Sequence, residues 1–380
     1  MNSSNSSQGC APHVITSHEI VAKILALSVI AVFDFLGNVL TIVVVCREKS
    51  LHNTVNYLMV NMAISDLIIP LIALPHMIFD LANSMDLGMW TVNGDFGIVL
   101  CKLFFFVADI SPSVSILSLV IITVDRFFAV MFPLRAGIAP LKRVNKVLIA
   151  LTWIVPALFL TPNLYSYNLI EHNDQTFCLS RFSENPVEEF KIQKILYTLI
   201  VVFFIILPFF VLIIMYTMIL LKLRQQDRSA MAMSQSKKER VIRFQKTRRV
   251  VFMALTVIVV FAVCWMPLNA FVFLIYHVWE PSDRENMCFL NILIFVVRFL
   301  GYANPLFNPV IYFIFIEKFR RGLLNCLTCR KRMPIVTMMN SDGRENSGRV
   351  MSKSMAVFDG GSPRTRASSG VSLQLQTHKL

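Results

Sequence analysis

Seven long apolar stretches follow one another along this chain of 380 residues. Each is long enough to cross a hydrocarbon core of ~30 Å, which takes about 20 helical residues. Backbone amides within a bilayer must find partners in their own segment or in a closed barrel, and runs so uniformly apolar do not suit alternating barrel strands. The sequence therefore predicts an all-α membrane protein in which residues 20–314 form a seven-transmembrane helix bundle. The stretches lie at residues 20–46, 55–82, 98–131, 144–164, 195–222, 249–276 and 287–314.

The basic residues indicate how the bundle is oriented. The net charge of +13 could point to a nucleic-acid partner, but Lys and Arg gather in the connections after the first, third and fifth stretches and after the seventh. The positive-inside rule makes these segments cytoplasmic. We therefore expect a multi-pass plasma-membrane protein with an extracellular N-terminus and no nucleic-acid partner. The residues are Arg47, Lys49, Arg135, Lys142, Arg143, Lys146, ten Lys or Arg from Lys222 to Arg249, Lys318, Arg320 and Arg321.

Two kinds of modification fit the outer side. Residues 1–19 carry Asn-x-Ser triplets at Asn2 and Asn5, where we expect glycans. Cys101 opens the third stretch and Cys178 precedes the fifth. Both lie on the oxidising side, so a disulfide between them would pin that connection over the mouth of the bundle. Another outer pair, Cys10 and Cys288, is expected either to form a disulfide or to remain as free thiols.

The chain after the seventh stretch is expected to lie on the cytoplasmic membrane surface and then to lose its structure. Residues 315–325 are amphipathic, which is typical of a short helix that contacts membrane lipid. Cys326 and Cys329 follow as a C-x-x-C without a second Cys or His pair at ligand spacing, so palmitoylation is favoured over metal binding. Residues 326–380 are otherwise polar, which predicts a disordered tail.

Short motifs in all seven stretches, from Gly37 to Phe319, resemble the rhodopsin-like (class A) G-protein-coupled receptors. The resemblance implies a receptor whose intracellular partners are a heterotrimeric G protein, arrestin and receptor kinases. The motifs are Gly37-Asn38, Asn61-Met62-Ala63-Ile64-Ser65-Asp66, Cys101, Asp125-Arg126-Phe127, Trp153, Pro208 with Tyr216, Phe261 with Cys264-Trp265-Met266-Pro267, and Asn308-Pro309 with Tyr312.

The family resemblance also assigns roles at the cytoplasmic end. It implies that Arg126 leaves Asp125 on activation to meet the G protein, and that Tyr216 and Tyr312 then close beneath it. The sixth stretch begins with Lys246-Thr247-Arg248-Arg249, without the carboxylate that holds the arginine in many relatives. We therefore expect a weak resting lock and some basal activity.

Proline and tryptophan mark the expected moving part. Pro267 cannot donate to the carbonyl one turn earlier, so it kinks the sixth helix and makes the cytoplasmic half a lever. Trp265, two residues before the kink, and Phe261, one turn earlier, are expected to face the bundle. Asn308 and Pro309 are the corresponding motif of the seventh helix.

A buried carboxylate suggests a cation site. An ionisable group at membrane depth costs about 2.5 kcal/mol or more and so needs partners. In the family, the residues at Asp66, Ser115, Asn304 and Asn308, with Asn38 beside them, hold a sodium ion that favours the resting state. No other cofactor is expected. Asp34, one turn from Asn38, is an unusual second carboxylate that either joins this cluster or is protonated.

The ligand site is expected between the outer halves of the helices. Residues 287–313 contain no lysine, which excludes a retinal Schiff base. Amine receptors carry an aspartate where this chain has Ala108, and Asp109 is rotated by about 100° from that position. We expect Phe105, Asp109, Trp265, Arg298 and Tyr302 to line the pocket, with Asp109 and Arg298 either contacting a ligand or pairing with each other.

The outer loops favour a peptide ligand. They are acidic, which would attract a cation, although acidity can also serve solubility alone. With the region from Cys101 to Leu134, they resemble the neuropeptide branch of the family. The alternatives are a receptor for an amine or another small molecule, or a seven-helix transporter, for which an internal repeat would be expected and none is found. No nucleophile or paired carboxylates suggest an enzyme.

Overall fold

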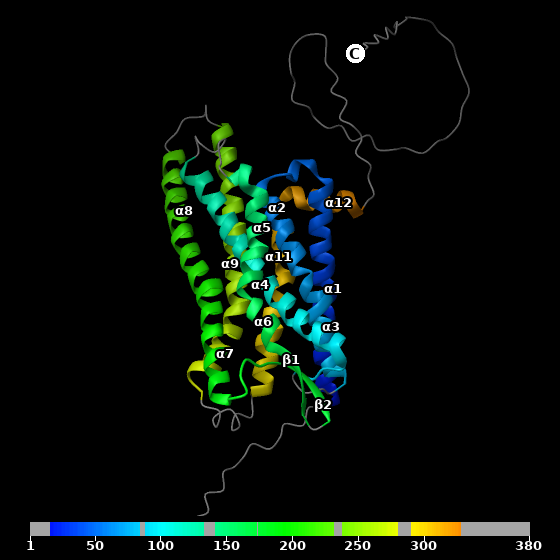
Figure 1. Cartoon of the computed structure of the whole chain (residues 1–380). Coiled ribbons are helices and arrows are strands. Elements are labelled where there is room, and N and C mark those ends of the chain that lie inside the picture. The colour runs from blue at the N-terminus through cyan, green and yellow to red at the C-terminus, as the bar shows by residue number, and fades with distance from the viewer. Residues whose placement is uncertain are drawn as a thin grey trace, which may run out of the picture. The chain divides into compact units, whose positions relative to one another are not determined.

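The computed structural model describes residues 16–83, 88–132, 141–172, 174–231, 238–279 and 290–327. Long helices pack side by side as a bundle in Figure 1, which confirms the predicted all-α fold. The elements are α1 (Ser17–Arg47), η1 (Lys49–Leu51), α2 (Thr54–Asp66), η2 (Ile69–Ala73), α3 (Leu74–Ala82), α4 (Gly94–Met131), α5 (Leu141–Phe159), α6 (Thr161–Ser166), β1 (Tyr167–His172), β2 (Gln175–Ser180), α7 (Pro186–Val201), η4 (Val202–Ile206), α8 (Leu207–Met231), α9 (Lys238–His277), α11 (Leu290–Phe315) and α12 (Glu317–Leu327).

Several sequence predictions fall on other parts of the chain. The expected glycosylation sites, the outer cysteine pair, one palmitoylation site and the tail lie outside the described residues. They are Asn2, Asn5, Cys10, Cys288, Cys329 and residues 328–380.

All seven predicted stretches coincide with helices. Within the described chain, six helical segments are long and apolar enough to cross a membrane, and α5 supplies a shorter apolar helix, Lys146–Phe159. The second span joins α2, η2 and α3 into Thr54–Ala82, and the fifth joins α7, η4 and most of α8 into Pro186–Gln226.

The fourth stretch is shorter than predicted. We expected residues 144–164, but α5 ends at Phe159 and α6 begins at Thr161. Pro162 disfavours helical geometry in the residue before it and is tolerated in the first turn of a helix, where its missing N–H would have no partner. The break places α6 and the strand after it across the mouth of the bundle, beside α4.

The fifth and sixth helices are longer than their apolar stretches. α7 begins at Pro186, where Asn185 caps the helix by accepting from the Val187 N–H at 3.0 Å. α8 ends at Met231 and α9 begins at Lys238, so both helices continue beyond their apolar stretches into basic sequence. The π-helical turn η4 precedes Pro208, which has no N–H to donate to the Phe204 carbonyl.

A two-stranded hairpin covers one end of the bundle. β1 and β2 are antiparallel, with Leu169 opposite Cys178. The predicted disulfide between Cys101 and Cys178 is confirmed and joins β2 to α4, with Cα atoms 5.8 Å apart. The Cys178 N–H also donates to the Gly88 carbonyl at 2.8 Å. We call this the hairpin end and the opposite end the α12 end (Figure 1).

The side chains are distributed as expected for a bundle in lipid. Leu58, Met62, Phe261 and Tyr312 are at most 2% exposed. Large apolar side chains also cover outer faces, such as Ile213 of the fifth span at 64% exposed. Apolar surface on this scale would be a liability in water but is well solvated by hydrocarbon.

The helix α12 folds back against α1. The predicted segment was 315–325, whereas α11 ends at Phe315 and the helix covers Glu317–Leu327. Phe319 is completely buried, with its ring centroid 6.1 Å from Tyr312. Gly322 permits a close approach, because a Cβ at this position would lie 2.7 Å from Val44 Cγ1. The location of α12 on a membrane surface stays a prediction.

We predict that Gly322→Ala lowers the melting temperature of the purified protein, because overpacking a tight contact costs about 1–3 kcal/mol. Val44→Ala removes the opposing atom, so Gly322→Ala should cost less in a Val44→Ala background. Thermal melting of the four proteins in detergent measures the difference. Equal shifts in both backgrounds would show that the two residues do not compete for space.

Candidate functional site

The expected ligand residues on α4 lie beneath the hairpin. Phe105 stacks on Tyr167 of β1, with ring centroids 4.3 Å apart and an interplanar angle of 8°. Asp109, one turn further, has an exposed side chain whose Oδ2 accepts a hydrogen bond from Asn163 Nδ2 of α6 at 3.1 Å. The hairpin and α6 therefore form part of the same site as α4.

Arg298 and Tyr302 of α11 lie close enough to Asp109 to interact with it. All three interact electrostatically, and Tyr167 takes part as well. Burial and the neighbouring Asp109 raise the pKa of Tyr167, so it remains a neutral hydrogen-bond donor at physiological pH. No ion pair between Asp109 and Arg298 is found among the described residues, because no nitrogen of Arg298 lies within 4.0 Å of an Asp109 carboxylate oxygen. Of the two sequence alternatives, direct pairing is therefore not observed.

Trp265 lies deeper in the bundle, among aromatic rings. Its ring centroid is 6.2 Å from Phe261, which in turn lies 6.1 Å from Phe209. The indole Nε1 is buried and lacks a hydrogen-bond partner in the described chain. Gly301 of α11 packs against the indole, since a Cβ there would lie 3.5 Å from Cζ3. A small displacement of Trp265 would thus be transmitted directly to α11 and Phe261.

Asp66 joins three helices through hydrogen bonds. Its Oδ1 accepts from Ser115 Oγ of α4 at 2.8 Å, and its Oδ2 accepts from Asn308 Nδ2 of α11 at 2.8 Å. Asp66 is 1% exposed, and Asn304, one turn before Asn308, is 2% exposed. The structure thus brings together Asp66, Ser115 and Asn308 of the predicted cluster.

The donor set of this cluster fits a hard cation. Carboxylate, hydroxyl and amide oxygens are the ligands that such ions take. Each Asp66 oxygen accepts one hydrogen bond and retains a further lone pair. The buried Asn38 Oδ1 has no hydrogen-bond partner among the described residues. Asp66, Ser115, Asn304 and Asn308 would hold the ion, whose chemistry there is neutralisation of buried charge.

The arginine at the α12 end is paired within its own helix. Arg126 Nε donates to Asp125 Oδ2 at 3.0 Å, and Nη2 makes a second contact with the same oxygen. α9 offers it no carboxylate between Thr247 and His277. Tyr216 of α8 is buried and interacts with Arg126 and Thr123 of α4. Tyr312 donates to Met62 Sδ at 3.8 Å.

Two interactions escaped the sequence analysis. The sequence identified Asn61 and Trp153 only as parts of family motifs. In the structure, Trp153 Nε1 donates to Asn61 Oδ1 at 2.8 Å, and Asn61 Nδ2 donates to Ser118 and Thr152. These bonds tie α2 to α4 and α5. The role of Asn163 was also missed, because its position depends on the break at Leu160, which no periodicity signals.

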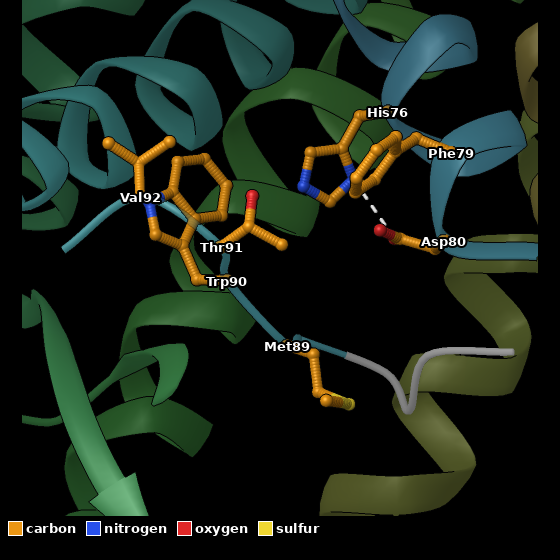
Figure 2. A pocket seen from close by; sticks show the side chains of 7 residues that line it. All are labelled: His76, Phe79, Asp80, Met89, Trp90, Thr91 and Val92. Carbon is orange, nitrogen blue, oxygen red and sulfur yellow. Dashed lines mark ion pairs between the residues drawn. The ribbon is translucent and has the colours of Figure 1, made fainter. Parts of the chain in front are cut away.

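A small cavity near the hairpin end was missed as well (Figure 2). It has a volume of about 120 Å³. His76 Nδ1 lies 3.0 Å from Asp80 Oδ2, and the His76 ring stacks on Trp90 at 5.3 Å. The spacing of four residues on α3 could have indicated the pair. The lining residues are His76, Phe79, Asp80, Met89, Trp90, Thr91 and Val92.

Comparison with known proteins decides the family. The family model described as "7 transmembrane receptor (rhodopsin family)" matches residues 37–312. The chain belongs to this family. It is therefore a rhodopsin-like (class A) G-protein-coupled receptor, a multi-pass membrane protein and not an enzyme, as the motifs from Gly37 to Tyr312 predicted.

Individual relatives cover most of the chain. Neuropeptide receptor 22 of Caenorhabditis elegans is 27% identical over 83% of this chain and 70% of its own length. Growth hormone secretagogue receptor type 1 of Mustela putorius furo is 31% identical over 81% of this chain and 80% of its own. The QRFP-like peptide receptor of Branchiostoma floridae is 29% identical over 78% and 74%.

We predict that Ser115→Ala lowers the melting temperature of the purified receptor more than Ser113→Ala does. The measurement is made in choline chloride, so that no sodium ion contributes to stability. Ser115 donates to a buried carboxyl group on another helix, a contact worth about 1–2 kcal/mol. Ser113 donates only to the Asp109 carbonyl of its own helix, at 3.3 Å. Equal shifts would mean that Asp66 does not depend on the Ser115 hydroxyl.

Proposed function

We propose that this receptor binds an extracellular peptide at its hairpin end and activates a heterotrimeric G protein at its α12 end. The hairpin end then faces the outside of the plasma membrane, and the N-terminus is extracellular. The observation that carries the ligand class is the pair of opposite charges, Asp109 and Arg298, which interact electrostatically without forming an ion pair among the described residues.

A peptide suits this pair because it carries both kinds of partner. A basic side chain or an amino terminus would bind Asp109, while a carbonyl or carboxylate would bind Arg298. Phe105, Tyr302 and Trp265 supply apolar and aromatic walls. The names of the relatives, which include a neuropeptide receptor and a QRFP-like peptide receptor, support the same class.

The acidic side chains of the outer loops also support a cationic ligand. Glu171, Asp174, Glu184 and Glu188 are exposed and would speed the encounter with a positive peptide. The Glu189 carboxylate instead stabilises its own loop, because its Oε2 accepts hydrogen bonds from the Phe182 N–H at 2.6 Å and the Ser183 N–H at 2.8 Å. Glu280, Asp283 and Glu285 lie outside the described residues.

An amine receptor is the second candidate. The exposed Asp109 carboxylate favours it, since it could pair with a ligand ammonium. This reading leaves Arg298 without a role. A ligand that needs Asp109 but is indifferent to Arg298 would therefore be an amine, whereas a peptide should need both.

The mechanism is a shift in population between two arrangements of α9. A ligand that fits the open arrangement better moves the equilibrium by no more than its difference in affinity. Pro267 lacks the N–H that would bond to the Val263 carbonyl, so the helix can bend there. Arg126 would leave Asp125 and contact the G protein, and Tyr216 and Tyr312 would close beneath it.

The resting state has its own proposed stabiliser. A sodium ion held by Asp66, Ser115, Asn304 and Asn308 would neutralise the buried carboxylate and keep α2, α4 and α11 together. Arrestin and receptor kinases, as partners of the activated state, and palmitate on Cys326 and Cys329 belong to the same proposal.

We predict that Arg126→Ala abolishes agonist-stimulated nucleotide exchange while surface expression is retained, because the guanidinium is the proposed contact with the G protein. Arg320→Ala is the control, since the exposed side chain of this arginine bonds only to the Ile314 carbonyl among the described residues. Exchange is measured with the purified G protein in the same membranes. Full exchange by Arg126→Ala would remove the residue from the coupling surface.

The agonist is first identified by testing neuropeptides on cells that express this receptor, with dissociation of the heterotrimeric G protein as the readout. We then predict that Asp109→Asn and Arg298→Gln each lower its potency by about tenfold or more, as a charge-assisted contact is worth about 1.5–3 kcal/mol. Asp174→Asn removes an equal charge from the hairpin turn and should change potency less. Unchanged potency for both pocket variants would contradict the proposed site.

A further inference from the structure

A series of hydrogen bonds begins at Asp109 and runs through α6 to the end of the hairpin. Asp109 Oδ2 accepts from Asn163 Nδ2 of α6 at 3.1 Å. On the same short helix, Ser166 Oγ accepts from Ser180 Oγ of β2 at 3.0 Å, and the Ser166 carbonyl accepts from the Arg181 N–H at 2.9 Å. The helix that bonds to the proposed ligand carboxylate therefore also holds the last residue of the hairpin.

Gln193 of α7 continues the series from the hairpin to α9. Its Nε2 donates to the Ser180 carbonyl at 3.2 Å, and its Oε1 accepts from the Tyr276 hydroxyl of α9 at 3.2 Å. Nε2 also donates to Glu189 Oε1, one turn earlier on α7. Because both partners of Nε2 are acceptors, the amide can take only this orientation. One side chain thus joins the hairpin to α9.

The part of α9 that Gln193 contacts lies beyond the kink at Pro267 and packs against α7. The ring centroid of Tyr276 is 5.5 Å from that of Tyr197 and 5.7 Å from that of Phe190. Tyr197 also donates to the Asn269 carbonyl at 2.8 Å. The series of hydrogen bonds therefore ends on the segment that sets how α9 approaches its kink.

These bonds belong to the arrangement proposed above for the receptor without ligand, since Arg126 is paired with Asp125 in the structure. A ligand cation at Asp109 would compete with Asn163 for the same carboxylate oxygen. Its binding would remove the first bond of the series, and α6 would lose one of its attachments to α4.

We propose that Gln193 is a positioning residue that transmits ligand binding at Asp109 to α9. While the series is intact, it holds the outer part of α9 in the resting arrangement. When the ligand displaces Asn163, this support weakens and the population shifts towards the open arrangement. The route passes over the outer elements and is separate from contact with Trp265. The inference rests on the proposed function, since it requires a ligand at Asp109.

The test measures nucleotide exchange by the purified full-length receptor with G protein and without ligand, per amount of monomeric receptor. Gln193→Ala removes both connections and should raise this basal exchange about two- to tenfold, the factor for one lost hydrogen bond. Tyr276→Phe removes only the hydroxyl that reaches Gln193 and should give an increase of similar size. It supplies the same test if the Gln193→Ala protein does not fold. Gln175→Ala, which truncates an exposed side chain at the hairpin turn, should behave as wild type.

Asn163→Ala gives a readout that a purely local role of Gln193 would not change. It imitates the first effect of the ligand by removing the donor to Asp109, so it should also raise basal exchange. In the Gln193→Ala background it should add less than about twofold, because the series is already broken. Independent sites would instead give the product of the two increases.

The outcomes separate this inference from the proposed function. Basal exchange that is unchanged or lower in Gln193→Ala and Tyr276→Phe, even with a lower melting temperature, would overturn the inference. Increases that multiply with Asn163→Ala would also overturn it, because Gln193 would then act independently of the ligand site. In either case the proposed function stands if an agonist still requires Asp109 and Arg298. It fails if no agonist promotes nucleotide exchange.

Discussion

Polar groups buried in a lipid-embedded bundle must find their partners within it, and in this receptor several of them do so between helices. Asp66 bonds to Ser115 and Asn308, and Asn61 bonds to Ser118, Thr152 and Trp153. These contacts join α2 to α4, α5 and α11. Breaking any of them would leave a buried polar atom without water to replace the lost partner, so these four helices behave as one rigid frame.

The helix α9 is attached to its neighbours differently along its length. Towards the hairpin end, Tyr197 of α7 donates to the Asn269 carbonyl at 2.8 Å, and Tyr276 donates to Gln193 at 3.2 Å. From Val250 to Met266 the only hydroxyl is on Thr256, and it bonds to the Phe252 carbonyl of its own helix at 2.9 Å. Pro267 separates the two regions. After Pro267 the helix is therefore held partly by hydrogen bonds to α7, whereas between Val250 and Met266 its described side chains are held mainly by apolar packing.

The sequence predicted the helices and the Cys101–Cys178 disulfide, and it placed Ser115 and Asn308 near Asp66, because these follow from apolar length, compartment and short motifs. It failed where geometry between distant segments decides. The break near Leu160 determines the position of Asn163. Only the folded loop shows that the Glu189 carboxylate accepts hydrogen bonds from two backbone N–H groups. The pairing of His76 with Trp90 likewise needs the packed structure. The buried Asn38 oxygen that has no hydrogen-bond partner among the described residues could be found only by following each hydrogen bond.

The central claim is that α9 swings about Pro267 against a frame that stays in place. The most direct measurement is the distance between spin labels on α9 and α5, attached at the exposed positions Arg248 and Lys146. We predict a longer distance when agonist and G protein are both present, with no change between labels on α5 and α1. An unchanged distance under an agonist that drives nucleotide exchange would contradict the account.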